Sequence, residues 1–552
     1  MKTYTIGIDF GTLSGRCVLV DCENGQELAE AVSMYAHGVM DDRLPSGREL
    51  PPQFALQHPE DYLDVLRTTV REVLEKAQIP AEQVVGVGID FTSCTVLPVN
   101  KAGVPLCMTP AFADEPHAYV KLWKHHAAQP EADELNELAA RRKEPWLLAY
   151  GGRVSSEWAL PKLLETLRNA PAVYAETARF MEAADWIVST LIGEESCSRP
   201  FAGYKALYHN NTYPSNDFMV ALDKGLDGVV GTKISECIAE IAAPAGRLCA
   251  AGAALTGLNE GTVIAVPQID AHAAMPALQI TEAGELMLIM GTSACHIVNA
   301  EEAVDVSGIC GYVENGVIPG LVTYEAGQAA VGDIFDWFVK NCVPARYQTE
   351  ADSRKISLHT LLTEKAELLA VGQTGLIALD WFNGNRSVLD DSQLSGMILG
   401  LDLSTKPEHI YRALLEATAF GTKKIVDALS FPIHTIKVAG GIANKNPLLM
   451  QIYADVLGKE LGVCQSTQAA ALGSAIYAAT AAGIYPDIAS AAKAMGTPVT
   501  KLYHPSQREH QAYELLYKDY VALHDYFGRD GNDVMKRLLS QRHEEWTDGG
   551  AV

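Results

Sequence analysis

Two aspartates stand at the ends of apolar runs, where a buried strand would deliver a carboxylate to a loop. Asp9 follows the run from Tyr4 to Ile8, and Asp270 follows the run from Thr262 to Ile269. Phosphoryl transfer to an alcohol needs a carboxylate to accept the hydroxyl proton and another to hold Mg²⁺. An aspartate at a strand end is also a common cap of the next helix, and taken alone Asp270 fits that simpler interpretation better.

The segment after Asp9 has the composition of a phosphate-binding loop. Glycine lets backbone N–H groups approach phosphate oxygens, hydroxyl groups add donors, and an arginine adds positive charge. The residues concerned are Gly11, Thr12, Ser14 and Arg16. The same residues would also make an ordinary hairpin turn, and a phosphate loop can be a hairpin.

A second strand-like run ends in the same way half a chain later, at Gly291, Thr292 and Ser293. The repeat suggests two related half-molecules, although Gly-Thr turns after strands are common and could be two unrelated turns. We place the boundary in the polar segment Thr281 to Gly284, which predicts domains of residues 1–282 and 283–552.

A third glycine turn joins an apolar run to a helix that starts at Pro447. Its residues are Gly440, Gly441 and, three positions on, Asn444. Glycines in this place allow a flat ring or a phosphate to come close, but a tight strand-to-helix turn would use them as well.

The elements that must position these residues are short buried strands alternating with helices. The apolar runs are Tyr4 to Asp9, Val84 to Asp90, Thr262 to Asp270, Leu286 to Thr292 and Thr435 to Gly441. Apolar residues at helical spacing over 63–77 and 410–425 predict two helices between them. The Ala-rich stretch 461–486 is interrupted by glycine and polar residues, so we interpret it as a strand end and a helix rather than a membrane span. The class is therefore α/β.

The length of the chain predicts its number of domains, and its net charge limits the classes of molecule that it can bind. A chain of 552 residues predicts two large domains with a cleft available between them. With 68 acidic and 43 basic side chains the formal charge is -25, which disfavours nucleic acid and anionic membranes. The eleven cysteines are scattered without a CxxC pair, and the chain opens directly into an apolar run. We therefore expect reduced thiols in the cytoplasm.

Other nucleotide-binding fingerprints are missing from the sequence. It contains no GxxxxGK[ST] and no complete GxGxxG. The triplet Asp9-Phe10-Gly11 matches the DFG of protein kinases, but nothing that must precede it does, so we interpret that match as chance.

In this order and spacing, Gly7 to Thr12, Gly291 to Ser293 and Gly440-Gly441 resemble the two phosphate loops and the adenosine loop of the superfamily of sugar kinases, heat-shock chaperones and actin. Within it the chain resembles the FGGY carbohydrate kinases. Ser155 to Leu163 resembles the first family signature, and Gly396 to Leu401 with His409-Ile410 resembles part of the second. The resemblance covers residues 3–520 and implies a two-lobed, actin-like ATPase fold, ribonuclease H-like, with two related domains around a central cleft.

Finer features resemble the L-ribulokinase branch of the family. They are Ala36 to Val39, Leu56 to Pro59, Trp123 to His126, Gly203 to Ala206 and Tyr324 to Gln328. The resemblance implies ATP and Mg²⁺ as cofactors, L-ribulose and other 2-ketopentoses such as D-ribulose as substrates, and a 5-phosphate product in L-arabinose catabolism. A homodimer is compatible with it, and the sequence does not decide the oligomeric state.

The resemblance also implies a role for each matching residue. Asp270 becomes the catalytic base and Asp9 the magnesium-associated carboxylate. The γ-phosphate cradle would be Thr12, Ser14, Arg16, Thr292 and Ser293, and the sugar site would be Ser93, Cys94, Lys205 and Glu325. Without the resemblance, Lys205 would be an ordinary solvated cation and Glu325 an acid at a helix N-terminus.

Two departures from the branch concern the sugar pocket. Ser93 stands where a smaller apolar residue is expected, and Tyr208 stands where tryptophan is expected. They leave selection among ketopentoses open, because an added hydroxyl can bind a sugar OH or reject its epimer. Two alternatives therefore stay open: a kinase for xylulose, glycerol or a similar substrate, and a chaperone-like or filament-forming ATPase.

Overall fold

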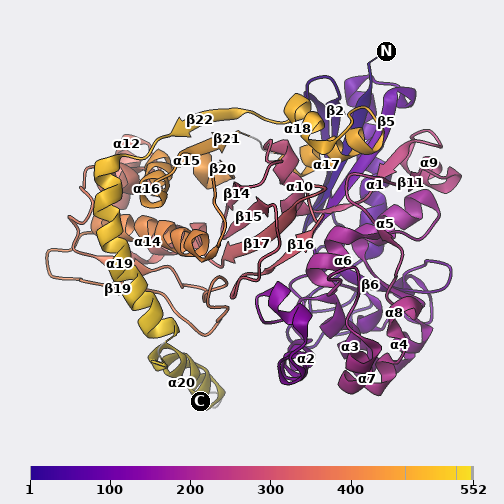
Figure 1. Ribbon diagram of the computed structural model, residues 1–552, viewed down its shortest axis with the longest axis horizontal. Helices are drawn as coiled ribbons and strands as arrows, with labels where there is room; N and C mark the ends of the chain where they lie inside the picture. Colours follow the sequence, from indigo (N-terminus) through magenta and orange to yellow (C-terminus); the bar gives the residue numbers. More distant parts are fainter. Residues whose placement is uncertain (1, 466–467, 530, 549–552) are drawn as a thin grey trace.

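The computed structural model describes residues 2–465, 468–529 and 531–548, with side chains up to residue 541. The chain forms two lobes, each built around one seven-stranded sheet (Figure 1). In Figure 1 the first half of the chain, in indigo and magenta, makes the lobe on the right, and most of the second half makes the lobe on the left.

The sheet of the first lobe has the strand order β11-β12-β5-β1-β2-β3, and β13 pairs with the end of β5. Its strands are β1 (Tyr4–Phe10), β2 (Ser14–Asp21), β3 (Glu27–Met34), β5 (Val84–Phe91), β11 (Pro244–Arg247), β12 (Val263–Ala265) and β13 (Gln268–Ile269). Strands β1, β2 and β3 are antiparallel, whereas β5 is parallel to both β1 and β12. The carboxyl ends of the parallel strands therefore meet at one edge of the sheet.

The sheet of the second lobe has the order β16-β17-β15-β14-β20-β21-β22. Its strands are β14 (Glu285–Met290), β15 (Ala294–Ala300), β16 (Gly311–Glu314), β17 (Val322–Gln328), β20 (Thr435–Ala439), β21 (Leu461–Cys464) and β22 (Val499–Tyr503). Three neighbours, β14, β15 and β17, are antiparallel, and β20 is parallel to β14 and β21. Apart from β13 in the first sheet and the edge strand β16 in the second, the order and directions of the strands repeat those of the first sheet, which confirms the predicted pair of related α/β halves.

Helices cover both sheets. Those of the first half are α1 (Pro59–Ala77), α2 (Gln129–Arg142), α3 (Ala159–Asn169), α4 (Pro171–Glu176), α5 (Ala183–Ile192), α6 (Arg199–Lys205), α7 (Asn216–Leu222), α8 (Val229–Thr232), α9 (Ala250–Thr256) and α10 (Asp270–Ala277). Those of the second are α11 (Gly332–Cys342), α12 (Ala345–Arg354), α13 (Leu358–Glu367), α14 (Pro407–Ala428), α15 (Gly441–Lys445), α16 (Pro447–Leu457), α17 (Ala469–Ala481), α18 (Ile488–Met495), α19 (Gln507–Gly528) and α20 (Val534–Asp548).

A smaller four-stranded sheet lies beside the first lobe. Its order is β4-β7-β6-β8, with β4 (Leu56–Gln57), β6 (Val96–Val99), β7 (Val120–Lys121) and β8 (Arg179–Glu182). Its strand β6 follows β5 directly, so the turn between β5 and β6 lies next to the carboxyl edge of the main sheet. Two further strand pairs, β9 (Cys197–Ser198) with β10 (Ile238–Ala239) and β18 (Ile377–Leu379) with β19 (Met397–Leu399), lie outside these sheets.

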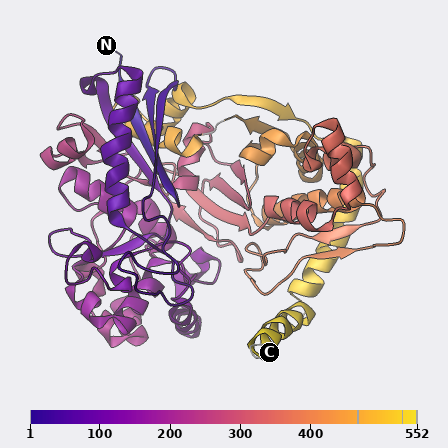
Figure 2. The ribbon, with the colours of Figure 1, turned by 180° about the vertical axis from the view of Figure 1, so that it is seen from behind.

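Helix α17 joins the lobes, because it comes from the second half of the chain and packs on β1, β5 and α10 of the first. Figures 1 and 2 both show it beside the indigo strands. The packing is backbone against backbone: a Cβ at Gly7 would lie 1.8 Å from the Ala471 carbonyl oxygen, and one at Gly88 would lie 1.9 Å from that of Ser474. Glycine is therefore required at these strand positions. The boundary at 282–283 falls between α10 and β14 and stays a prediction.

The helix predictions over 63–77 and 410–425 are confirmed by α1 and α14, and Pro447 starts α16. The stretch 461–486 forms β21 and α17, although its residues 466 and 467 lie outside the described part. The single strand expected from Thr262 to Ile269 is wrong. It breaks into β12 and β13 at Pro267, which has no N–H to donate to a sheet. Asp270 is the first residue of α10 and Ile269 is its N-cap, so the helix-cap interpretation of Asp270 is also wrong.

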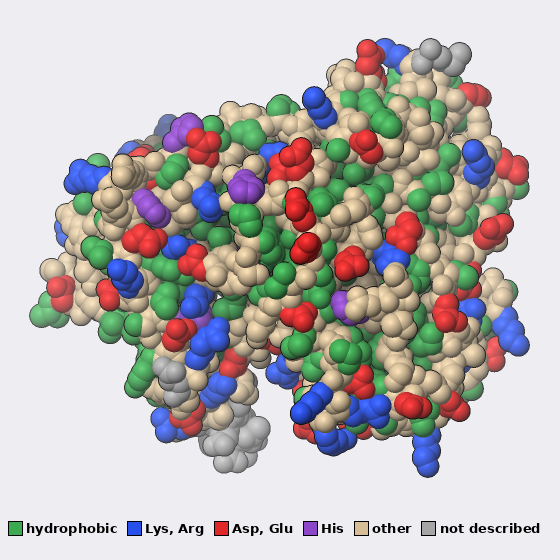
Figure 3. All heavy atoms as spheres, viewed as in Figure 1, with side chains coloured by type: hydrophobic (Ala, Val, Ile, Leu, Met, Phe, Trp, Pro, Cys, Tyr) green, Lys and Arg blue, Asp and Glu red, His purple; other side chains and the backbone are tan. Residues whose placement is uncertain are grey.

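The surface agrees with the composition. Figure 3 shows Lys and Arg side chains scattered among Asp and Glu over one face of the molecule. All eleven cysteines carry free thiols. Among the described residues, no helix has the length and hydropathy needed to span a bilayer.

Candidate active site

Three aspartates meet at the carboxyl edge of the first sheet. Parallel pairing of β1 and β5 sets Asp9 opposite Asp90. Gln268 of β13 also pairs with Asp90, which brings Asp270, two residues after Gln268, to the same edge. Ligands of open α/β sheets bind outside this edge. Asp9 and Asp270 are partly exposed, and Asp90 is fully buried.

Burial and mutual repulsion raise the pKa values of this group. Burial raises the pKa of Asp270 to about 7, and the negative charge of Asp9 adds to the effect. Burial also raises the pKa of Asp9, although a hydrogen bond with Asp90 and the charge of Arg16 offset part of that rise. Asp270 is thus poised to exchange a proton near neutral pH, as a general base must.

Asp90 ends one of the apolar runs of the sequence, but it is not among the predicted site residues. It accepts a hydrogen bond of 2.6 Å from the Ser474 hydroxyl of α17. Burial and the charge of Asp9 raise its pKa well above the usual range. An acidic residue at the end of an apolar run is the pattern that pointed to Asp9 and Asp270, and the same pattern could have pointed to Asp90.

The strand-end carboxylates are oxygen ligands of the kind that Mg²⁺ prefers. Within the described ranges no cluster of three or more His, Cys, Asp or Glu side chains could hold a metal. Mg²⁺ is usually held by one or two carboxylates together with substrate phosphates and water. Asp9, which lies opposite Asp90 at the ends of β1 and β5, fits that pattern.

The first predicted phosphate loop is the hairpin between β1 and β2. Its Gly11 N–H donates to the Ser14 carbonyl oxygen at 3.0 Å. Arg16, on β2 opposite Asp9, donates from Nη1 to the Gln468 side chain at 2.8 Å, at the start of α17. The prediction that this loop is a hairpin is confirmed.

Three side chains from other segments hold the same loop. The Tyr35 hydroxyl donates to the Gly11 carbonyl oxygen at 3.0 Å, and Gln57 Nε2 donates to the Thr12 carbonyl oxygen at 2.7 Å. The Trp123 indole N–H reaches the Thr12 hydroxyl at 3.2 Å. Gln57 and Trp123 lie in two of the segments that carry the resemblance, and the structure gives both a contact with the loop.

The second loop, between β14 and β15, is also a hairpin, one residue tighter than the first. The Gly291 N–H donates to the Ser293 carbonyl oxygen at 2.9 Å, and the loop is held from behind by backbone N–H groups. Val331 donates to the Thr292 carbonyl oxygen at 2.7 Å, and Gly332 donates to that of Gly291 at 3.1 Å. Gly332 starts α11, and a Cβ there would lie 2.6 Å from the Gly291 oxygen.

The double glycine lies next to this second loop. Gly440 has φ of 112°, and a Cβ on it would lie 2.2 Å from the Met290 carbonyl oxygen, whereas a Cβ on Gly441 would meet nothing within 4 Å. Asn444 is exposed, and its side chain donates to the Gly440 carbonyl oxygen at 3.2 Å. The second phosphate loop and the predicted adenosine loop thus form one surface.

The predicted sugar residues Lys205 and Glu325 form an ion pair of 3.0 Å across the two lobes. Lys205 ends α6 and is 6% exposed, so the interpretation as a solvated cation is wrong. Glu325 lies within β17, so it is not an acid at a helix N-terminus. Burial disfavours its charge, but Lys205 and a contact of 3.4 Å with His272 outweigh burial and hold the pKa of Glu325 below its usual range.

His272 and the turn after β5 complete the surroundings. His272 is fully buried on α10, two residues after Asp270, and its role was not predicted; no spacing in the sequence marks it. In the turn, Ser93 is partly exposed and Cys94 is buried in the left-handed region with φ of 58°. The charges of Asp9 and Glu325 both raise the pKa of Asp270, which links the three parts of the site electrostatically.

The two sheets share a strand pattern, each has a glycine loop at the end of its central strand, and carboxylates lie at the edge of the first sheet. These features define a phosphotransferase of the actin-like ATPase fold. Family models agree on the class. Residues 4–275 match the N-terminal domain, and residues 286–482 the C-terminal domain, of the FGGY family of carbohydrate kinases. The chain belongs to this family.

Relatives and solved structures agree with that assignment. The chain is 51% identical to a ribulokinase of Shouchella clausii over 100% of both chains, and 50% identical to a ribulokinase of Halalkalibacterium halodurans over 97% of both. A xylulose kinase of Rhodospirillum rubrum, 24% identical, superposes with a TM-score of 0.78 over 95% of this chain and 98% of its own. A glycerol kinase of Plasmodium falciparum with ADP, 17% identical, gives 0.74 over 94% and 98%. These two structures are similar in fold.

Proposed function

We propose that the protein transfers the γ-phosphoryl group of ATP to the 5-hydroxyl of L-ribulose, and also accepts other 2-ketopentoses such as D-ribulose. The observation that carries the proposal is the buried Lys205–Glu325 pair beside Asp270, in a chain 51% identical over its full length to a protein named ribulokinase. A buried ion pair presents both a donor and an acceptor, the groups that a polyhydroxylated ketone needs.

Asp270 acts as the general base in this proposal. Its pKa of about 7 lets it take the proton of the attacking hydroxyl at neutral pH and hold it after transfer. Its own backbone neighbour fixes the carboxylate, because the Ala271 N–H donates to Oδ1 at 2.7 Å. Oδ2 is then free to face the sugar.

The two hairpin loops position the phosphates. Thr12, Ser14, Thr292 and Ser293 offer hydroxyls and backbone N–H groups from opposite lobes, and Arg16 adds a positive charge. Charge spreads over the equatorial oxygens in the transition state of phosphoryl transfer, so donors fixed in advance lower the barrier. Asp9 would hold Mg²⁺, which neutralises phosphate charge when bound.

Two further parts of the proposal rest on the sequence. The free thiols and the family's substrates fit a cytoplasmic enzyme of L-arabinose catabolism. The alternative kinases for xylulose or glycerol would share Asp9, Asp270 and the loops, so only the sugar residues separate them. Membership of the carbohydrate kinases removes the support for a chaperone-like or filament-forming ATPase.

The test is ADP release by the wild type and Asp270→Asn with Mg-ATP and L-ribulose, D-ribulose, D-xylulose, L-xylulose or glycerol. We expect the highest kcat/KM with L-ribulose, and a loss of several hundredfold or more in the variant, the range of a general base. ATP binding by the variant, measured by calorimetry, is the control for folding. A wild type that prefers xylulose or glycerol would overturn the proposed substrate.

A further inference from the structure

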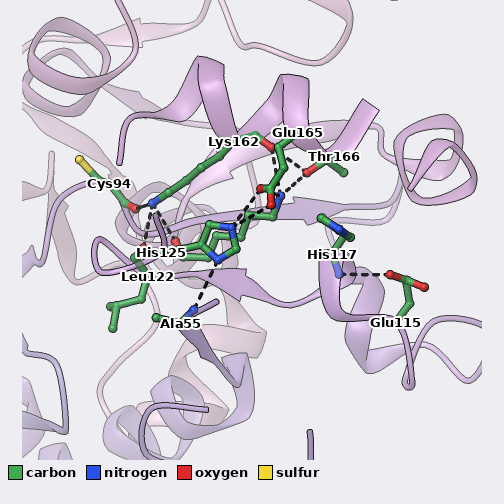
Figure 4. A network of polar contacts seen from close by, with 10 residues as sticks. Ala55, Cys94, Glu115, His117, Leu122, His125, Lys162, Glu165 and Thr166 are labelled. Atoms are coloured by element: carbon green, nitrogen blue, oxygen red, sulfur yellow. Dashed lines mark hydrogen bonds and ion pairs between the residues drawn. The ribbon is translucent and has the colours of Figure 1, made fainter. Parts of the chain in front are cut away.

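The first family signature contributes a lysine for which neither the sugar contacts nor the phosphate loops have a use. Lys162 lies on α3, and its side chain is fully buried. Its ammonium donates to the carbonyl oxygen of Cys94 at 2.6 Å and to that of Leu122 at 2.8 Å (Figure 4). A longer contact of 3.5 Å reaches the Lys121 carbonyl oxygen.

The two near carbonyls belong to two different walls of the site. Cys94 lies in the turn after β5, next to the partly exposed Ser93 of the predicted sugar site. Leu122 follows β7 and precedes Trp123, whose indole N–H holds Thr12 of the first phosphate loop. One ammonium therefore ties the sugar turn to the segment that supports the phosphate loop.

The sugar turn is held from a second side by Glu182, at the end of β8. Its Oε2 atom accepts the Thr95 N–H at 3.0 Å, and the hydroxyls of Thr92 and Thr95 lie 2.9 Å apart. The turn needs such support, because Cys94 has a φ of 58°, a left-handed conformation that costs a residue with a Cβ.

A buried lysine lowers the stability of the fold unless its ammonium makes hydrogen bonds that another side chain could not make. Within the described residues, the Lys162 ammonium donates hydrogen bonds to backbone carbonyl oxygens alone. Burial lowers the pKa of Lys162 to about 8. Burying a charge costs free energy unless it is paired and hydrogen-bonded. A compact ammonium with three donors, however, can join carbonyls of separate segments, which methionine cannot.

A neighbouring lysine shows the difference. Lys121 is equally buried, but it pairs with Glu165 at 2.6 Å and donates to the Thr166 hydroxyl at 2.6 Å and to the Lys162 carbonyl oxygen at 3.1 Å. Figure 4 shows Glu165 and Thr166 away from Cys94. His125 bonds the same carboxylate at 3.0 Å. This second cluster stabilises the packing of α3 without a contact to Cys94.

We propose that Lys162 is a positioning residue for the sugar: by holding Cys94 and Leu122 together, it sets the place of the Ser93 turn relative to Trp123 and the first phosphate loop. The inference rests on the proposed function, since it assigns Lys162 to the placement of that substrate. Misplacement of a bound substrate by about 1 Å can cost as much as 100-fold in rate.

The test compares Lys162→Met, Lys162→Gln and the matched control Lys121→Met in the full chain. We measure kcat and KM for L-ribulose and D-ribulose, KM for ATP, and the melting temperature alone, with sugar and with Mg-ATP. For both Lys162 variants we expect a KM for L-ribulose about tenfold higher or more, a changed preference between the epimers, and a KM for ATP within about twofold of wild type. Lys121→Met should lose stability while keeping the wild-type KM and epimer preference.

Three results would overturn the inference. The first is a sugar KM within twofold of wild type in folded Lys162 variants. The second is an equal loss in Lys121→Met. The third is a failure of both Lys162 variants to fold while Lys121→Met folds. Lys162 would then be needed for folding and not for placing the sugar. If the wild type does not use L-ribulose, the proposed function fails, and the same comparison with the sugar that it does use still decides the role of Lys162.

Discussion

The two sheets share a strand pattern but carry different side chains at matching positions. When the Gly11-Thr12 and Gly291-Thr292 turns are aligned, Asp9 of β1 corresponds to Ile289 of β14. The pairing registers extend the match, because Asp9 lies opposite Asp90 on β5 and Ile289 lies opposite Ala439 on β20. One sheet therefore ends in two carboxylates where the other ends in two apolar residues.

Under the proposed function this difference would divide the tasks of the lobes. The first sheet would supply the acids for metal and proton chemistry, and the second would place apolar residues beside Gly440-Gly441, at the proposed nucleoside site. The loops differ as well. Side chains of Tyr35, Gln57 and Trp123 hold the first loop, whereas backbone groups hold the second. The same strand pattern thus carries different chemical groups at its strand ends.

Exchanging the matched residues tests this division most strongly. Asp9→Asn removes the carboxylate expected at the metal, and we expect kcat to fall by about 100-fold or more, as for a lost electrostatic contact in the transition state. Ile289→Asn puts the same amide at the matching place of the second sheet, and its kcat should stay within about tenfold. Steady-state kinetics over a range of Mg²⁺ concentrations measures both variants.

Equal losses in the two variants would break the comparison, since they would mean that both strand ends contribute alike. If Asp9→Asn alone needs more Mg²⁺, the difference between the two strand ends is supported, because Ile289 has no group that binds a cation. Melting temperatures of both variants show whether either loss comes from unfolding.

A second test concerns Glu325, whose negative charge in the second lobe raises the pKa of Asp270 in the first. Burial, then the charges of Asp9 and Glu325, raise the pKa of Asp270 to about 7. The kcat/KM for sugar should therefore fall about tenfold per pH unit below that value, because the base becomes protonated. Glu325→Gln removes one negative charge and leaves Lys205 unpaired, so the acidic limb should move to lower pH.

The matched control is Glu301→Gln, an exposed acid of the same lobe, which should leave the limb in place. A limb that stays near pH 7 in Glu325→Gln would show that the second lobe does not tune the base.

The raised pKa of Asp270 also fixes the direction in which folding stability changes with pH. Because the folded pKa of Asp270 exceeds the unfolded value, its contribution is complete at low pH and is lost as pH rises through about 7. Asp270→Asn should flatten that slope in denaturant titrations.

Local patterns predicted the fold better than the site. The apolar runs that end at Asp9, Asp90 and Gly441 are strands, and the helical spacing over 63–77 and 410–425 gives α1 and α14. Each of these signals depends on neighbours along the chain. The strand before Asp270 was predicted too long because Pro267 interrupts a run that hydrophobicity alone would continue.

The contacts that assemble the site could not be predicted in this way. Asp90 meets Ser474, and Lys205 meets Glu325, across separations of 384 and 120 residues. No periodicity encodes such pairs, and only the resemblance pointed to Lys205 and Glu325. Lys162 lay inside a recognised signature, yet its partners are backbone carbonyls, which leave no pattern in a sequence.

The smallest expected effects separate the two adjacent glycines of the second lobe. Gly440→Ala places a Cβ 2.2 Å from the Met290 carbonyl oxygen at a φ of 112°, so it should lower the melting temperature and disturb β14. Gly441→Ala adds a methyl group into open space, so stability should stay at the wild-type level. If the nucleoside binds there, that methyl should raise the KM for ATP by about tenfold, the lower end of the effect of one methylene in a pocket, and leave the KM for sugar unchanged. A Gly441→Ala variant with an unchanged KM for ATP would place the nucleoside elsewhere and leave the second sheet's apolar edge without its proposed task.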